Sequence, residues 1–305
     1  MQPMLRTFLS LPGRTLAAAL LLLQAVAALA QGGSTPLLWE VRSETNVVHL
    51  FGTIHVGASK MYPLGAAVEQ AFAASKALAL EADPTNQSAL TAVTQGSIYQ
   101  PPDTLAKHIS PRLMEQLTKA LPTLGLPIEY ARAMRPHMLA MTLTMLEIGR
   151  EGYDPNQGLD VHFAQLAKQQ GKHIVELESL GEQMALLNSF SPELQEAMLQ
   201  ASLDSIADGS MKTDLAELVA AWRAGDADRL MTQVDKETES LPAAVAKDFK
   251  TRLYDQRNQV MSEKIAGMLK GNEPTFVAVG TGHLVGPAGV VEILKAKGYE
   301  VRQIK

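Results

Sequence analysis

The chain contains no cysteine among its 305 residues. It therefore forms no disulfide, has no cysteine nucleophile, and must hold any metal ion through His, Asp or Glu. Basic residues are also scarce, with 27 Lys and Arg against 32 Asp and Glu, so a nucleic-acid partner is not expected. The sequence lacks His-Glu-x-x-His, Gly-x-Ser-x-Gly and Gly-x-x-x-x-Gly-Lys-Ser/Thr, which excludes familiar protease and nucleotidase classes.

One long hydrophobic run lies near the start of the chain, from Thr15 to Ala27. Arg6 and Arg14 precede this run and Ala28-Leu29-Ala30 follows it, in the order typical of a secretory signal peptide with its A-x-A cleavage site. The run is short for a membrane span, although an uncleaved anchor is the alternative interpretation. We therefore expect residues 1–30 to be removed, leaving a periplasmic or secreted protein without a membrane span.

The pattern of hydrophobic residues predicts an α/β fold of the mixed α+β kind. Residues 31–305 are expected to form a single domain, in which residues 84–272 are a mostly helical insertion or cap. Short β-rich runs near both ends of this domain predict a central mixed sheet built from the N-terminal and C-terminal parts. The predicted strands are Leu37–Arg42 and Val47–Phe51, joined as a hairpin, a short strand from Ala77 to near Glu81, His173–Glu178 within the helical middle, Thr275–Val279 and Tyr299–Ile304.

Helix starts in the middle segment are marked by two Ser-Pro pairs, Ser110-Pro111 and Ser191-Pro192. A serine hydroxyl can cap the free N–H groups of a first turn, and a proline fits the first helical position because it has no N–H to satisfy. Helices are therefore predicted to begin at both pairs.

Two segments at opposite ends of the chain share a Gly-x-x-His pattern, each directly after a predicted strand. They are Gly52-Thr53-Ile54-His55 and Gly280-Thr281-Gly282-His283. Glycine at the first position lets the backbone turn sharply or approach another group closely, because no Cβ is in the way. The histidine can then project beyond the edge of the sheet.

A third polar residue, Glu81, also follows a short buried strand. Ligands of such sheets gather beyond the carboxyl ends of the strands, so we expect His55, Glu81 and His283 to meet there. Two imidazoles and one carboxylate form an open site suited to Zn, Mn, Co or Fe(II). Such a metal lowers the pKa of bound water and polarises a carbonyl.

These segments allow two other interpretations. In the simpler interpretation, His55 and His283 only form hydrogen bonds within tight turns, and Glu81 caps a helix. In the other, Val277 to Gly286 is a dinucleotide-binding turn; its glycine spacing is one residue too long, and the next strand ends at the chain terminus without an acidic residue for a ribose. The repetition of the motif favours the metal site over both.

These motifs together resemble the TraB/PrgY/GumN family, which is related to the Tiki proteases. The resemblance rests on Leu50–Gly57, Glu81 and Gly280–His283, and covers essentially the whole chain after residue 30. Further similar segments are Gly158-Leu159-Asp160, Gly171–Ser179, and Arg257-Asn258 with Met261.

The resemblance implies a mixed α/β fold related to the erythromycin-esterase and haem-binding ChaN-like proteins. It also implies a metal-dependent hydrolase, a Tiki-like peptidase with a peptide or protein substrate and Mn, Co or Zn as its metal. Metal-ligand candidates are then His55, Glu81 and His283; candidates for general base, ligand orientation or substrate binding are Glu81, Asp160, Glu178, Arg257 and Asn258.

The alternative function is a non-catalytic protein that holds haem, a metal or a peptide in the same cleft. Tyr62, close to His55 in sequence, would be an axial ligand candidate for haem. The sequence carries no signal for the oligomeric state, and substrate preference would be decided in the helical segment 84–272, where no motif occurs.

Overall fold

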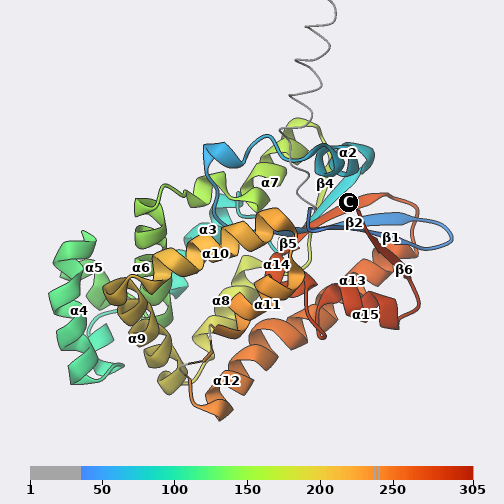
Figure 1. The fold of residues 1–305 in the computed structure, drawn as a ribbon. Helices are drawn as coiled ribbons and strands as arrows, with labels where there is room; N and C mark the ends of the chain where they lie inside the picture. Colours follow the sequence, from blue (N-terminus) through green and yellow to red (C-terminus); the bar gives the residue numbers. More distant parts are fainter. Residues whose placement is uncertain (1–35, 237, 240, 305) are drawn as a thin grey trace, which may run out of the picture. The chain divides into compact units, whose positions relative to one another are not determined.

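The computed structural model describes residues 36–304 except 237 and 240. Its six strands form one mixed sheet in the order β4-β3-β5-β2-β1-β6 (Figure 1). β1 runs antiparallel to β2 and to β6, whereas β2, β5, β3 and β4 are mutually parallel. The strands are β1 Leu38–Arg42, β2 Val47–Thr53, β3 Ala77–Leu80, β4 His173–Glu176, β5 Thr275–Gly280 and β6 Glu300–Gln303. The sheet confirms the predicted α/β class. It also confirms that strands from the N-terminal and C-terminal parts of the domain form one sheet.

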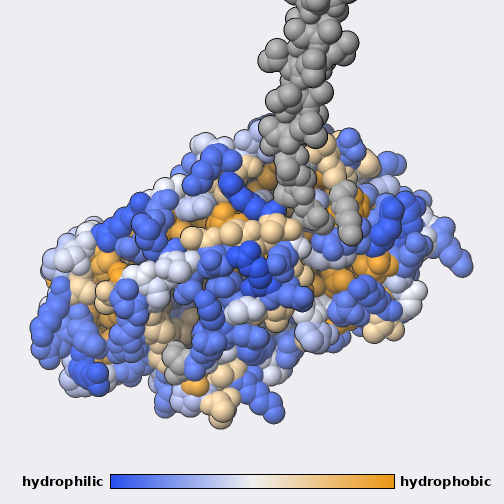
Figure 2. All heavy atoms as spheres, viewed as in Figure 1, coloured by the Kyte–Doolittle hydropathy of each residue, from blue (hydrophilic) through white to orange (hydrophobic). Residues whose placement is uncertain are grey.

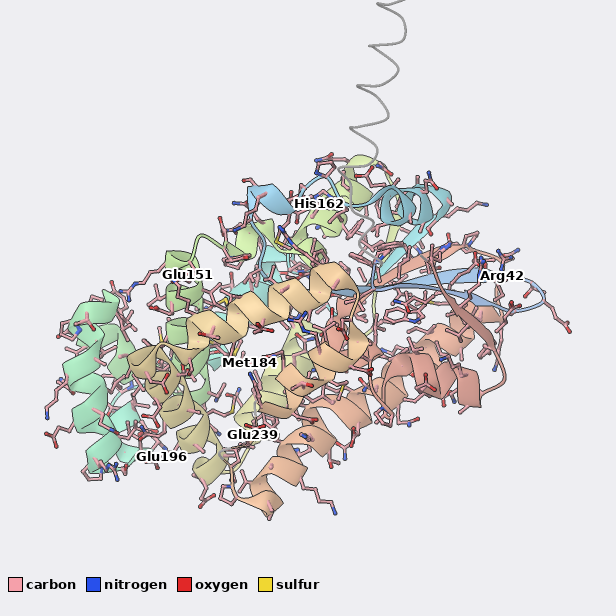
Figure 3. The ribbon with its side chains drawn as sticks, in the orientation of Figure 1. Arg42, Glu151, His162, Met184, Glu196 and Glu239 are labelled. Carbon is pink, nitrogen blue, oxygen red and sulfur yellow. The ribbon has the colours of Figure 1, made fainter. Side chains whose placement is uncertain are left out.

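The hairpin between β1 and β2 is tied to the C-terminal part of the chain through its turn. The backbone N–H of Ser43 donates to the carbonyl of Asn46 across the turn. The Asn46 side chain in turn donates to the carbonyls of Met268 and Glu273, at 2.8 and 3.0 Å. Arg42 lies at this end of β1 and binds Glu40 on the same strand (Figure 3). The turn residues thus fix the hairpin beside the segment that leads into β5.

Each face of the sheet is covered by helices, because side chains alternate along the strands and both sets are apolar. On one face Leu50 and Val277 pack with residues of α13 (Gln256–Leu269) and α15 (Val290–Ala296). On the other face Phe51 and Phe276 pack with residues of α2 (Ala66–Ala74) and α7 (Leu159–Gln169). Full burial of each such side chain contributes roughly 1.5–3 kcal/mol, so packing on both faces fixes the strand register.

The middle of the chain is helical, as predicted, and contributes the edge strand β4. Ser110 and Ser191 cap their helices, since each hydroxyl accepts a hydrogen bond from the backbone N–H three residues on, at 3.3 and 3.2 Å. The remaining helices are α3 Gln87–Gly96, α4 Pro111–Leu124, α5 Ile128–Ala133, α6 Pro136–Arg150, α8 Leu180–Asn188, α9 Pro192–Asp208, α10 Ser210–Ala224, α11 Ala227–Lys236 and α12 Ala243–Lys250, with the short α14 Thr281–Leu284 after β5.

Within the described residues, no helix combines the length and the apolar character needed to cross a membrane. The predicted signal peptide, residues 1–30, lies outside the described residues.

Candidate active site

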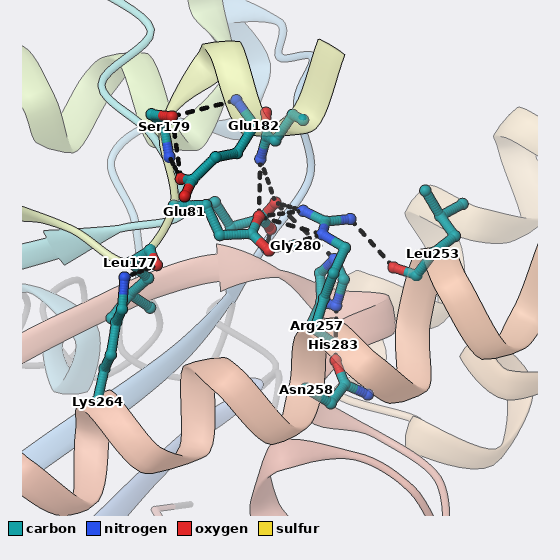
Figure 4. A network of polar contacts seen from close by, with 12 residues as sticks. Glu81, Leu177, Ser179, Glu182, Leu253, Arg257, Asn258, Lys264, Gly280 and His283 are labelled. Carbon is teal, nitrogen blue, oxygen red and sulfur yellow. Dashed lines mark hydrogen bonds and ion pairs between the residues drawn. The ribbon is translucent and has the colours of Figure 1, made fainter. Parts of the chain in front are cut away.

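The two Gly-x-x-His motifs and Glu81 meet at one edge of the sheet. The strands β2, β5 and β3 are adjacent and parallel, and their registers pair Thr53 with Gly280 and Leu80 with Ala278. Their carboxyl ends therefore lie side by side, as the sequence predicts. The Nε2 atom of His283 is 3.8 Å from Oε2 of Glu81, although the two residues are about two hundred positions apart in the chain (Figure 4).

The motif glycines are needed for the close approach of the two motifs. A Cβ on Gly52 would lie 2.8 Å from Oγ1 of Thr281, which belongs to the second motif. A Cβ on Gly280 would lie 2.9 Å from Oε1 of Glu81 and 3.3 Å from Nε2 of His55, which belongs to the first. Each glycine thus makes room for the other motif. Neither glycine has a positive φ, so neither is needed for a left-handed backbone conformation.

The backbone of Gly280 also binds Glu81 directly. Its N–H donates to Oε1 of Glu81 at 2.5 Å, where β5 passes into α14. A carboxylate that accepts a backbone N–H is held in one orientation and favoured in its ionised form. The glycine thus provides both the space and one hydrogen bond for Glu81.

The His283 side chain is held by Asn258 of α13. Its Nδ1 lies 2.6 Å from Oδ1 of Asn258, and the Asn258 amide donates to the carbonyl of Ala288 at 2.8 Å. Because the amide is oriented by Ala288, its oxygen faces the ring and Nδ1 is assigned as the donor. Nε2 then has its lone pair directed towards Glu81. Burial lowers the pKa of His283, against the opposing charge of Glu81, so the neutral imidazole is favoured.

The His55 side chain is oriented by Asp160, in the first turn of α7. Its Nδ1 lies 3.4 Å from Oδ2 of Asp160, and its imidazole is 62% exposed to solvent. Partial loss of hydration lowers the pKa of His55, but the contact with Asp160 and its charge, followed by the charge of Glu81, outweigh this effect and raise the pKa. Solvent screens part of this effect at an exposed ring. The upward direction follows from two carboxylates beside one imidazole.

Arg257 joins two carboxylates through its planar guanidinium. Its Nε and Nη2 bind the two oxygens of Glu178 at 2.9 and 2.7 Å, and Nη2 also binds Oε2 of Glu81 at 3.0 Å (Figure 4). All three side chains are at most 13% exposed. Burial raises the pKa of Glu81, but the positive charge that His283 and His55 carry when protonated, together with Arg257 and the N–H of Gly280, lowers it, so Glu81 is a carboxylate at neutral pH.

Glu178 reaches this position because backbone pairing continues beyond β3 and β4. The N–H of Leu177 donates to the carbonyl of Leu80 at 2.8 Å, and the N–H of Glu178 to that of Glu81 at 2.6 Å. The two glutamates therefore end neighbouring strands side by side. Two adjacent carboxylates repel each other, which the guanidinium between them offsets.

Gln183 is part of the site but is not among the residues singled out by sequence. Its Nε2 donates to Oε2 of Glu81 at 3.3 Å and to Oε2 of Glu178 at 3.2 Å. The signal that would have found it is the capping box Ser179-x-x-Glu182, which begins α8 directly after Glu178. A helix starting there turns the side chain of its fourth residue back towards the strand ends.

Within residues 36–304, leaving aside positions 237 and 240, no group of three or more His, Asp and Glu side chains is arranged to hold a metal ion. The three predicted ligands converge, but both oxygens of Glu81 are already engaged, Oε1 by Gly280 and Oε2 by Arg257 and Gln183. Metal ligation by His55, Glu81 and His283 stays a prediction.

Tyr62, the sequence candidate for haem ligation, is occupied elsewhere. Its hydroxyl donates to the carbonyl of Gln157 at 2.7 Å, and its ring packs 4.6 Å from the ring of His162. Burial, and then the charge of Asp160, raise its pKa to about 12, so the phenol stays protonated. The hydroxyl therefore acts as a donor that fixes the loop before α7.

The sequence of this chain is similar to those of several known proteins. The sequence pattern of the TraB/PrgY/gumN family matches residues 37–303. The chain is 26% identical to the uncharacterized protein YbaP of Escherichia coli, over 81% of this chain and 87% of YbaP. It is 23% identical to the metalloprotease TIKI1 of Danio rerio, over 89% of this chain and 63% of TIKI1. No solved structure matches the chain closely enough to count as a relative.

The family match runs from β1 to β6 and includes every residue of the site described above. The resemblance drawn from the two Gly-x-x-His motifs is thereby confirmed. The chain accounts for less than two thirds of the length of TIKI1, which is named a metalloprotease. Because the family pattern matches residues 37–303, the chain belongs to the TraB/PrgY/gumN family.

Proposed function

We propose that this protein is a metal-dependent hydrolase, a Tiki-like peptidase that acts outside the cytoplasm. His55, Glu81 and His283 would hold the metal. One observation carries the proposal: both motif imidazoles have a side-chain oxygen at Nδ1, from Asp160 and from Asn258, while Nε2 of His283 faces Glu81 and Nε2 of His55 lies beside Gly280. Metal-binding histidines are anchored in this way at the nitrogen that does not touch the metal.

The donor set fits Zn, Mn or Co, since two imidazoles and a carboxylate are ligands that these ions accept. A bound ion of this type supplies a nucleophilic water of lowered pKa and polarises the substrate carbonyl. The neighbouring carboxylates of Asp160 and Glu81 favour a protonated His55. A metal binds only the neutral imidazole, so metal binding would release this proton.

The other residues of the site would prepare it for proton transfer. Arg257 binds both Glu81 and Glu178 and so holds their side chains next to each other. Glu178, two residues beyond β4, is our candidate for the general base that takes a proton from the attacking water, with Glu81 as the alternative. Gln183 holds both carboxylates at fixed positions through its amide N–H groups.

The test is elemental analysis of purified residues 31–305, followed by cleavage of a peptide library with chelator, and again with added Mn or Co. We expect bound divalent metal, cleavage that chelation abolishes, and loss of cleavage in His55→Ala and His283→Ala. His173→Ala, which removes an exposed imidazole on β4, is the matched control and should cleave normally.

The hydrolase proposal fails if the protein binds no divalent metal and both variants behave as the unmodified protein does. Metal or haem binding with no cleavage of any peptide would instead favour the non-catalytic binding protein. Export is tested separately, because the N-terminus of the protein recovered from the periplasm or medium should begin at Gln31.

A further inference from the structure

A large cavity lies in the helical part of the chain, between α6, α9, α10, α11 and α12. Its volume is about 820 Å³, which is within the range of roughly 300–1,000 Å³ found for ligand pockets. The face of the protein that includes α10 and α12 shows apolar residues set among hydrophilic ones (Figure 2). No part of the proposed catalytic centre lines this cavity, so it needs an explanation of its own.

The wall of the cavity is apolar and rich in methionine. Met141 and Met145 come from α6, Met198 from α9 and Met211 from α10, and Phe249 of α12 adds an aromatic ring. Met141 is 43% exposed, so part of this apolar wall is open to solvent. Methionine is flexible and polarisable, and surfaces rich in it adapt to varied apolar side chains.

The rim of the cavity is acidic. Asp204 and Asp208 of α9 and Asp214 of α10 line it, and Glu239, in the turn before α12, adds a fourth carboxylate (Figure 3). Lys236 is the single basic residue among the lining residues, and it lies 3.1 Å from Asp214. The opening therefore carries a net negative charge, which attracts cations and repels anions.

Ring contacts connect the cavity to the proposed catalytic centre. The ring of Phe249 in the cavity wall is 6.4 Å from the ring of Tyr254, and Tyr254 is 5.4 Å from the ring of His283. Leu218 also lines the cavity, one turn before Trp222 on α10. The Trp222 indole donates to the carbonyl of Gly52 at 2.8 Å. The second motif thus contacts Tyr254, five residues after the cavity residue Phe249, and the first motif contacts Trp222 of α10, a helix that forms part of the cavity wall.

We propose that this cavity binds an apolar segment of the substrate polypeptide that is flanked by Lys or Arg. The apolar wall would take the hydrophobic side chains, and the acidic rim would bind the flanking basic ones. A free fatty acid would fit the wall but not the rim, because its carboxylate would meet Asp204, Asp208 and Asp214. The inference rests on the proposed peptidase function and specifies the class of its substrate.

Binding is measured by fluorescence anisotropy with three labelled peptides: an apolar core flanked by Lys, the same core flanked by Glu, and a Ser-rich core flanked by Lys. The protein is residues 31–305 carrying Glu81→Gln, so that peptide is not consumed during the measurement. We expect the Lys-flanked apolar peptide to bind about tenfold more tightly than the Glu-flanked one at low salt, with a smaller ratio at high salt.

Two variants locate the binding. Asp204→Lys reverses an exposed rim charge and should weaken the Lys-flanked peptide about threefold or more, as expected for a lost ion pair near the surface. Ser205→Trp fills the cavity and should abolish binding, with thermal unfolding used to show that it is folded. Glu44→Lys makes the same charge change in the exposed β1–β2 turn and should bind as the parent does.

Equal binding of the Lys- and Glu-flanked peptides would overturn the proposal. So would undiminished binding of the Lys-flanked peptide by both Asp204→Lys and a folded Ser205→Trp. Tight binding of a fluorescent fatty acid that displaces the peptide would also overturn it. Failure of the peptidase function is separable, because binding is measured without turnover. Peptide bound as expected but never cleaved by the unmodified protein would refute catalysis and leave the docking site in place.

Discussion

Nε2 of His55 lies 3.3 Å from the position that a Cβ on residue 280 would occupy, so Gly280 leaves room that any larger residue would take from His55. The same Cβ would lie 2.9 Å from Glu81 Oε1. Real Cβ atoms are rarely so close to a polar atom, and β5 is paired on both sides, so its backbone has little freedom to withdraw. The first residue of the second motif therefore determines where the first histidine and the glutamate can be.

Gly280→Ala is expected to displace the side chains of Glu81 and His55 and to abolish peptide cleavage. The change adds one methyl group to a packed site, so the free energy of unfolding should fall by about 1–3 kcal/mol. Activity and urea unfolding measure the two effects. Gly267→Ala is the control: nothing lies within 4 Å of its Cβ, and this helical position should gain up to about 1 kcal/mol. Normal cleavage by Gly280→Ala would show that the contact does not matter.

Arg257→Leu is expected to lower the free energy of unfolding by about 3–5 kcal/mol, because it leaves Glu81 and Glu178 buried side by side without a cation. Adding Glu178→Gln to the same protein removes the repulsion and should recover a large part of the loss. Urea unfolding of the single variants and the double variant measures the coupling. Strictly additive effects of the two changes would contradict the bridging role of the guanidinium.

Gln183→Glu is expected to harm the protein more than Gln183→Leu. The leucine variant loses two hydrogen bonds to carboxylates, whereas the glutamate variant places a third carboxylate beside Glu81 and Glu178. Cleavage should fall in both, and stability should fall further in Gln183→Glu at neutral pH than at pH 4. Gln169→Glu, an exposed position at the end of α7, is the matched control. Equal stability of the two Gln183 variants would argue against this contact.

His137 is expected to make stability depend on pH below neutrality. The side chain is fully buried in α6, and burial lowers its pKa, against its hydrogen bond with Gln195. Because the folded pKa lies below the unfolded value of about 6.5, this contribution is complete above pH 6.5 and is lost as the pH falls towards the folded pKa. The limiting slope is one proton, about 1.4 kcal/mol per pH unit.

Urea unfolding of His137→Asn between pH 5 and 8 should therefore show a flatter profile than that of the unmodified protein. Asparagine keeps a donor for the Gln195 carbonyl oxygen but does not titrate. His173→Asn, at an exposed position on β4, should keep the original slope. Unchanged slopes in all three proteins would assign the pH dependence to other groups.

The candidate site was partly predictable because three of its residues follow strands. His55, Glu81 and His283 each come after a short apolar run, and parallel strands end at one edge of their sheet. The meeting of Glu178 with Arg257 had no such basis, since one ends an edge strand and the other begins a helix 79 residues later. Gln183 was missed because its role depends on the direction in which α8 starts.

By itself the sequence determined the local elements, the absence of thiol chemistry and the family, since caps, hydrophobic periods and the two motifs are all written in contiguous residues. Only the tertiary structure decided that Gly280 makes room for His55, that Arg257 bridges Glu81 and Glu178, and that a methionine-lined cavity has an acidic rim. The physical reason is that these features depend on strand order and on helices packing across the sheet. Such arrangements are set by contacts between residues far apart in the chain.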